Sequence, residues 1–242
     1  MPLASSRRLP APSSILPDLM AFALGIGVAA YSGWDVTTLV WGLWLSSLVV
    51  GYATIVTSAA RSATASVKLA KGGGPGARFA GLAGILGSLF ILAFFTVHFG
   101  GFHLAHSVFL FLFFPIGGVD FMREGGLPGV ADYVSVVKQA GFFLPAAILA
   151  ERRNIFPPRR VDMSLEEEAG AIGDGMVAPY KNVVRLHLLI FFFAFAHFTQ
   201  LDSLVVYVVV YAMYFFPLRA FFPKKTPAAT EVAPAEERRE AA

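Results

Sequence analysis

The chain has 242 residues, of which 56% are hydrophobic and only 14% are charged, and its formal net charge is +3. A typical soluble domain is roughly 45–50% apolar and about 25% charged, so this chain has too few charged side chains to cover a water-facing surface. The composition excludes a soluble domain, a disordered chain and a nucleic-acid-binding protein, and it indicates an integral membrane protein. Because the sequence contains no Cys, disulfides, thiol catalysis and Cys-ligated metal sites are also excluded.

Six apolar stretches follow one another along the chain. A membrane-crossing helix needs about 20 mainly apolar residues, and the sequence predicts such helices at residues 15–31, 36–56, 79–117, 132–150, 180–198 and 204–222. The predicted fold is an all-α, polytopic membrane helical bundle that forms a single domain over residues 1–222. Residues 223–242 are rich in Pro, Ala and Glu and are predicted to be a disordered cytoplasmic tail.

Two connections between these stretches carry much of the remaining charge. Residues 58–77 are predicted to be a loop with three basic residues and no acidic one, and the glycine-rich run at 72–76 is typical of a flexible linker. A glycine run can also bind phosphate, but this one lacks the lysine and the Ser or Thr of a P-loop. Residues 151–178 form a second charged loop, which contains the acidic run 166–168.

The basic residues predict the orientation of the chain, because Lys and Arg stay on the cytoplasmic side of a membrane. They gather at the N-terminus, at residues 61–78, at residues 151–181 and after the last span, whereas the connection 118–132 has three acids and one Arg. All basic segments lie on one side only if the tract 79–117 crosses once, as an extended helix with a kink at Gly100–Gly101. We therefore expect six spans with cytoplasmic N- and C-termini, in the bacterial inner membrane.

All five histidines lie in predicted spans: His98, His103 and His106 in the third, and His187 and His197 in the fifth. Ionisable groups in hydrocarbon are costly and usually face the bundle interior, so each is a candidate functional residue. His103 and His106 are three residues apart and share a helix face. Counted from the cytoplasmic side, His103, His106 and His197 form an outer cluster, with His98 and His187 deeper.

These histidines support three hypotheses about function. Imidazoles from different helices can bind a transition metal ion or the iron of a haem, so all five are candidate metal ligands in a redox role. They could instead line the path of a proton- or solute-conducting transporter. They could also hydrogen-bond neighbouring helices in a non-catalytic accessory subunit. The expected partners are the lipid bilayer and another membrane protein or a second copy; no catalytic residue is identified.

Other residues in the spans have simpler expected roles. Asp18 is expected in the first turn of its helix, where a carboxylate offsets the helix dipole. Trp34, Trp41 and Trp44 are predicted to anchor the chain at the outer interface as part of an aromatic belt. A stripe of glycines, at every third position of residues 81–87, favours close helix contact within the fold or between copies.

Two motifs contain three of the histidines. Residues 94–109 have an aromatic pair, then His98 before an aromatic residue and two glycines, then His106 eight residues later, while residues 179–187 begin with Pro-Tyr and a basic residue and end in a Leu-His step at His187. With these motifs the chain resembles an uncharacterised family of bacterial multi-pass membrane proteins, a domain of unknown function. The resemblance implies that these three histidines are its characteristic positions and the candidate cofactor-binding residues. Where that family has an acidic and amide pair after its tryptophan, this chain has two serines.

Overall fold

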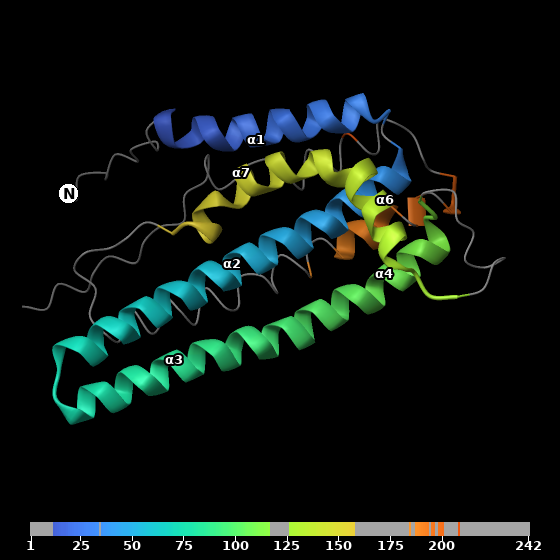
Figure 1. Cartoon of the computed structure of the whole chain (residues 1–242). Helices are drawn as coiled ribbons and strands as arrows, with labels where there is room; N and C mark the ends of the chain where they lie inside the picture. The colour runs from blue at the N-terminus through green and yellow to red at the C-terminus, as the bar shows by residue number, and fades with distance from the viewer. Residues whose placement is uncertain are drawn as a thin grey trace, which may run out of the picture.

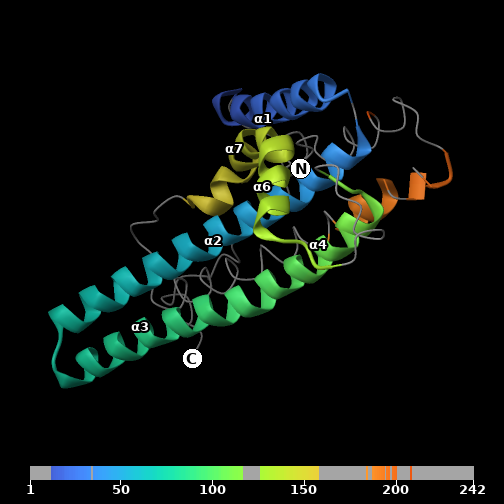
Figure 2. The ribbon, with the colours of Figure 1, turned by 45° about the vertical axis from the view of Figure 1, so that its right-hand side comes forward.

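The computed structural model describes residues 12–33, 35–116 and 126–157, together with positions 184, 187–193, 195–196, 198–200 and 208. All regular secondary structure in these ranges is helical (Figures 1 and 2). In chain order the elements are α1 (Pro12–Tyr31), α2 (Val36–Gly72), α3 (Pro75–Phe95), the π-helical turn η1 (Thr96–Gly100), α4 (Gly101–Phe113), α6 (Val130–Ala140), the 3-10 turn η2 (Gly141–Phe143) and α7 (Leu144–Ile155).

Three helical segments of the described chain are long and apolar enough to cross a membrane. They are α2, the run Pro75–Phe113 and the run Val130–Ile155, while α1 contains a shorter apolar helix. The all-α class expected from the sequence is therefore found in the described part of the chain. The predicted spans at 180–198 and 204–222 lie largely outside it, and the tail at 223–242 lies outside it entirely, so the count of six spans stays a prediction.

Helix α2 extends well beyond the predicted span at 36–56. Its 37 residues reach about 55 Å at about 1.5 Å per residue. The prediction of a loop at residues 58–77 is wrong, because the helix continues to Gly72 and only Gly73–Gly74 form the turn into α3. This segment is rich in Ala and Lys, which are strong helix formers. Pro75 then begins α3, in the first turn, where no backbone N–H is needed.

Small residues let α2 and α3 approach closely over this extension. A Cβ atom added at Gly81 would overlap the side chain of Ala70 and the backbone of Ser66, and one added at Gly84 would overlap the side chain of Ser66. The glycine stripe therefore makes close contact within the fold at two of its three positions. Gly87, the third, faces open space.

The same crowding occurs at Gly51, where an added Cβ would overlap the ring of Phe99. We expect Gly51→Ala to lower the free energy of unfolding by about 1–3 kcal/mol, because Phe99 is buried and has no room to move aside. The measurement is the denaturation midpoint of the purified protein in one detergent. Gly87→Ala is the matched control and is expected to be neutral or slightly stabilising. Equal destabilisation by both variants would contradict this packing.

Helices α3 and α4 form one continuous run of 39 residues, about 58 Å long, through the turn η1. The structure thus has a single long helix where the sequence predicts one crossing by the tract 79–117. The irregularity expected at Gly100–Gly101 takes the form of a π-helical turn at Thr96–Gly100. Such turns are frequent at functional sites because they shift the side chains that follow onto a different face. This one directly precedes the turn that carries His103.

The span predicted at 132–150 is not one straight helix. The 3-10 turn η2 divides it into α6 and α7, which run in clearly different directions (Figure 1). Pro145 lies in the first turn of α7, where its missing N–H costs no helical hydrogen bond. A proline inside an unbroken helix would lose such a bond, so the break at Gly141–Phe143 follows from the position of Pro145.

Polar contacts tie the helices together at one end of the bundle. The carboxylate of Asp18 in α1 pairs with the guanidinium of Arg152 in α7 at 2.6 Å, and Arg153 lies 3.8 Å from the same carboxylate. Asp18 is in the second turn of α1, so the expected role at the helix dipole is wrong. Arg61 of α2 donates to the carbonyl oxygen of Pro157 at 3.0 Å. We call the level of Arg61, Arg152 and Arg153 the basic end.

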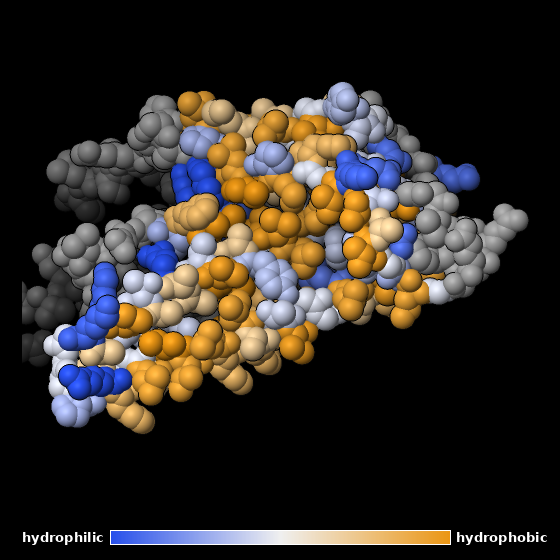
Figure 3. Space-filling view, in the orientation of Figure 1, coloured by the Kyte–Doolittle hydropathy of each residue, from blue (hydrophilic) through white to orange (hydrophobic). Residues whose placement is uncertain are grey.

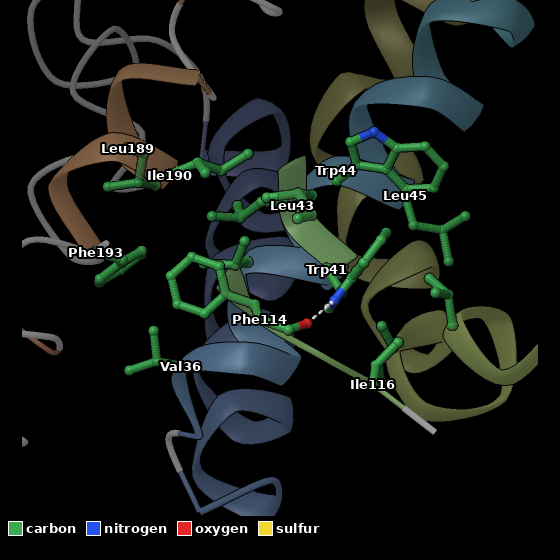
Figure 4. Close-up of a cluster of buried hydrophobic side chains, with 14 of the residues drawn as sticks. Val36, Trp41, Leu43, Trp44, Leu45, Phe114, Ile116, Leu189, Ile190 and Phe193 are labelled. Carbon is green, nitrogen blue, oxygen red and sulfur yellow. Dashed lines mark hydrogen bonds between the residues drawn. The ribbon is translucent and has the colours of Figure 1, made fainter. Parts of the chain in front are cut away.

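The hydrophobic core away from the basic end centres on Trp41 and Trp44 of α2 (Figure 4). The indole N–H of Trp41, a fully buried residue, donates to the carbonyl oxygen of Phe114 at 2.8 Å. The indole N–H of Trp44 donates to the carbonyl oxygen of His103 at 3.1 Å. The aromatic-belt prediction is wrong for both, because their N–H groups find carbonyl partners inside the bundle. Trp34 lies outside the described residues.

Candidate histidine site

Three histidines from two segments far apart in the sequence meet inside the bundle. His103 and His106 lie on α4, and His187 belongs to a helical stretch near the C-terminal end of the described chain. The ring centroids of His106 and His187 are 4.1 Å apart, and those of His103 and His187 are 6.1 Å apart. We call His103, His106 and His187 the histidine triad. The spacing of three residues within α4 predicted one of these pairings, and the fold supplies the others.

His103 is the most buried member of the triad, with 1% of its surface exposed. Its Nδ1 lies 3.0 Å from the carbonyl oxygen of Phe99, and its Nε2 lies 3.3 Å from the hydroxyl of Ser47. Because a carbonyl oxygen can only accept, Nδ1 carries the proton, and neutral Nε2 accepts from the serine hydroxyl. Both ring nitrogens of His103 are therefore bonded to the protein.

His106 differs from His103 in its hydrogen bonding. Its Nε2 is buried and has no hydrogen-bond partner among the described residues. Its ring is surrounded by the rings of His187, Phe102 and Phe191, with centroid distances of 4.1, 6.3 and 6.4 Å. A buried polar atom without a partner costs free energy and is rare in native proteins, so it needs a specific explanation. His106 is the residue of the triad best placed to exchange a proton or bind a ligand.

Two further polar side chains lie beside the triad. The hydroxyls of Ser107 and Tyr133 are 2.7 Å apart, and the ring of Tyr133 stacks on that of Trp44 at a centroid distance of 6.2 Å. Sequence reasoning missed both residues. Ser107 follows His103 by four positions and so shares its helix face, which is a usable signal. Tyr133 joins the group only because α6 crosses α4 at this level.

The remaining predicted residues are not part of the triad where the structure describes them. His98 is exposed and stacks on Phe94 with a centroid distance of 5.5 Å, and His197 lies outside the described residues. The prediction that His187 lies at a different depth from His106 is wrong, because their rings are in contact. Depth was counted from the start of each apolar tract, and α3 begins beside the long extension of α2, well before the other helices.

The triad does not have the geometry of a metal site. In the ranges that the structure describes, no three His, Asp or Glu side chains are arranged to hold a metal ion. With metal–nitrogen bonds of about 2 Å, two imidazoles on opposite sides of an iron have ring centroids about 6 Å apart, whereas those of His106 and His187 are 4.1 Å apart. His103 has no free ring nitrogen to offer. These rings are arranged to contact one another.

Comparison with known proteins gives a family and no activity. No curated protein and no solved structure matches the chain. A family of unknown function, DUF6498, matches residues 5–227, which include every helix described above and all five histidines. The chain belongs to the family of unknown function DUF6498.

Proposed function

We propose that this chain is an integral membrane protein that conducts protons through its histidine triad. In this proposal it spans the bacterial inner membrane six times with both termini in the cytoplasm, as the charge pattern predicts. The outer face of α3 and α4 supports the membrane setting, because Phe90, Phe94, Phe102 and Phe109 are each at least half exposed. The apolar surface is plain in Figure 3. A patch of this length needs lipid or protein against it.

The depth of the triad fits a conduction site. Ser47, the hydrogen-bond partner of His103, is 12 residues from Asp35 at the start of α2 and 14 residues from Arg61 at the basic end. At about 1.5 Å per residue these separations are about 18 Å and about 21 Å. A hydrocarbon core of roughly 30 Å, centred between the two charged levels, would therefore have its midplane close to the triad.

The buried Nε2 of His106 is the observation that carries the proposal. An imidazole binds a proton at one nitrogen and can release one from the other, which makes histidine a proton shuttle. Because His106 and His187 are in ring contact, protonating both would place two positive charges about 4 Å apart in a medium of low dielectric constant. The pair would hold one proton at a time and pass it on. Chains of such groups are typical of membrane proton pathways.

A polar connection leads from the triad away from the basic end. Ser107 lies on the same helix face as His103, and its hydroxyl contacts that of Tyr133 at 2.7 Å. Tyr133 follows Asp132, whose carboxylate accepts from the backbone N–H of Gly129 at the start of α6. These hydroxyls and the carboxylate provide proton-exchanging groups between the triad and this end of the bundle.

Proton flux in liposomes tests the proposal. The full-length protein is reconstituted with an internal pH-sensitive dye, and a potassium gradient with valinomycin sets the membrane potential. We expect proton uptake faster than in protein-free vesicles, and dependent on pH between about 5 and 8, where histidine exchanges protons. Flux equal to that of protein-free vesicles at both polarities would refute conduction and favour the accessory-subunit role.

A redox protein that binds haem or a transition metal is the second candidate. It would use the same facing pair, His106 and His187, with His197 as a further ligand. The rings would have to separate from 4.1 Å to about 6 Å. Metal analysis and an optical spectrum of the purified protein test it. Stoichiometric metal or a Soret band that His106→Ala removes would support this candidate, and its absence from protein purified out of metal- and haem-supplemented cells would refute it.

A further inference from the structure

The α2–α3 hairpin projects beyond the basic end of the bundle, as Figures 1 and 2 show. Helix α2 continues for 11 residues from Arg61 to Gly72, about 17 Å at about 1.5 Å per residue. The first turns of α3 pack antiparallel against this extension through Gly81 and Gly84. We call residues 62–88 the hairpin tip.

The outer face of α3 within the hairpin tip is apolar and uncovered by the described residues. Phe79, Leu82 and Leu86 are 76%, 55% and 58% exposed. Their spacing of three and then four residues puts them on one helix face. In Figure 3 the apolar strip along α3 continues to the hydrophilic end of the hairpin. This face is the surface for which we seek an occupant.

Lipid alone does not cover the whole apolar face of the long helix. From Phe79 to Phe113 the face extends over 34 residues, about 51 Å. A helix tilted by about 40°, the upper end of the usual range, crosses a hydrocarbon core of roughly 30 Å in about 39 Å. About eight residues remain outside, and because Arg61 and Arg152 mark the basic end, these are the residues of the hairpin tip.

The charge of the hairpin selects against a second copy at this face. Residues 36–116 contain four basic residues and no acidic one. Three of the basic residues, Lys68, Lys71 and Arg78, lie within the hairpin tip. Two hairpins packed face to face would bring like charges together with no acid to offset them. The surface therefore fits an apolar segment rich in acids.

The chain itself contains such a segment, and we propose that residues 161–178 dock on the α3 face of the hairpin tip. These residues lie outside the described part of the chain; they carry five acidic residues, no basic one, and apolar residues that include Leu165. Docking would bind the connection between α7 and the helix of His187 to the hairpin. Charge complementarity and apolar cover support the pairing.

The tether has the required length. The carbonyl oxygens of Ile155 and Pro157, which precede the segment, are bonded to Thr57 and Arg61 at the base of the hairpin tip. Nine residues separate Pro157 from Glu166, enough to span up to about 30 Å when extended. Lys71 is ten residues from Arg61, about 15 Å along α2. A short tether gives a high effective concentration, so modest contacts suffice.

Cysteine cross-linking tests the docking, because the chain has no Cys of its own. The full-length variant Leu82→Cys/Leu165→Cys is treated with a short bis-maleimide in nanodiscs of zwitterionic lipid. We expect an intrachain cross-link, seen by mass spectrometry, at least tenfold faster than in Thr64→Cys/Leu165→Cys. Thr64 is exposed on α2 and lies about 200° around the helix from Ser66, which faces α3.

Charge reversal separates this pairing from other occupants. Replacing Glu166, Glu167 and Glu168 with Lys is expected to slow the Leu82–Leu165 cross-link at least tenfold, and Lys68→Glu/Lys71→Glu in the same chain is expected to restore it. Equal rates at Leu82 and Thr64, or no effect of reversal, would overturn the proposal. Cross-links between chains would indicate a second copy. Protection of Leu82→Cys from maleimide only in anionic nanodiscs would indicate lipid instead.

Discussion

The variant His106→Phe is expected to reduce proton flux to that of protein-free vesicles while leaving the fold as stable as before, or more stable. Phe has a ring of similar size but binds no proton, so the step between His106 and His187 is lost. The substitution also removes a buried Nε2 that has no hydrogen-bond partner among the described residues. Such an atom costs about 1–3 kcal/mol. The measurements are the liposome flux and the denaturation midpoint in one detergent.

Two other histidines provide matched controls. His98 is exposed and lies away from the triad, so His98→Phe is expected to keep its flux. His103→Phe is expected to lower the free energy of unfolding by about 1–3 kcal/mol, because it removes the bonds to Phe99 and Ser47. Full flux in His106→Phe, or an equal loss in His98→Phe, would show that the triad does not conduct.

The largest expected loss of stability comes from Trp41→Ala. Trp41 is fully buried, its ring lies 4.5 Å from that of Phe111, and its indole N–H bonds the carbonyl oxygen of Phe114 (Figure 4). Truncation of a buried Trp to Ala typically costs about 3–5 kcal/mol, because a large cavity is left. We expect a loss of that size in the free energy of unfolding, measured by titration with a denaturing detergent.

Trp41→Phe separates the hydrogen bond from the packing. It keeps an aromatic ring at this position but leaves the Phe114 carbonyl oxygen without its donor, so a smaller loss of about 1–3 kcal/mol is expected. If Trp41 were instead a ring anchored at a membrane interface, both variants would change the free energy of unfolding by less than about 1 kcal/mol. That outcome would contradict its place in the core.

Local properties of the chain are enough to predict the class of the fold. Apolar runs of about 20 residues can satisfy their backbone polar groups in lipid only as helices or closed barrels, and their length favours helices. The long tract 79–117 therefore corresponds to one continuous helical run, Pro75–Phe113. The rarity of polar groups in these runs also singles out the histidines, and the spacing of His103 and His106 predicts a shared helix face.

Local properties were misleading where a distant contact changes the outcome. The glycine-rich stretch at 58–77 has the composition of a linker, but α2 stays helical to Gly72, and small residues there pack against Gly81 and Gly84. Trp41 has the composition of an interfacial anchor until the carbonyl oxygen of Phe114 supplies a partner for its N–H. Neither contact is visible from sequence spacing.

The site depends most on tertiary structure. The sequence alone determines that the chain is helical, apolar and oriented by its basic residues, because these properties belong to single segments. Which histidines meet depends on how far each helix extends past its neighbours, and α3 starts many residues beyond the basic end. That offset brings His106 against His187 and leaves His98 on the outer surface. Only the packing of whole helices fixes such an offset, because no residue within one helix specifies its depth beside another.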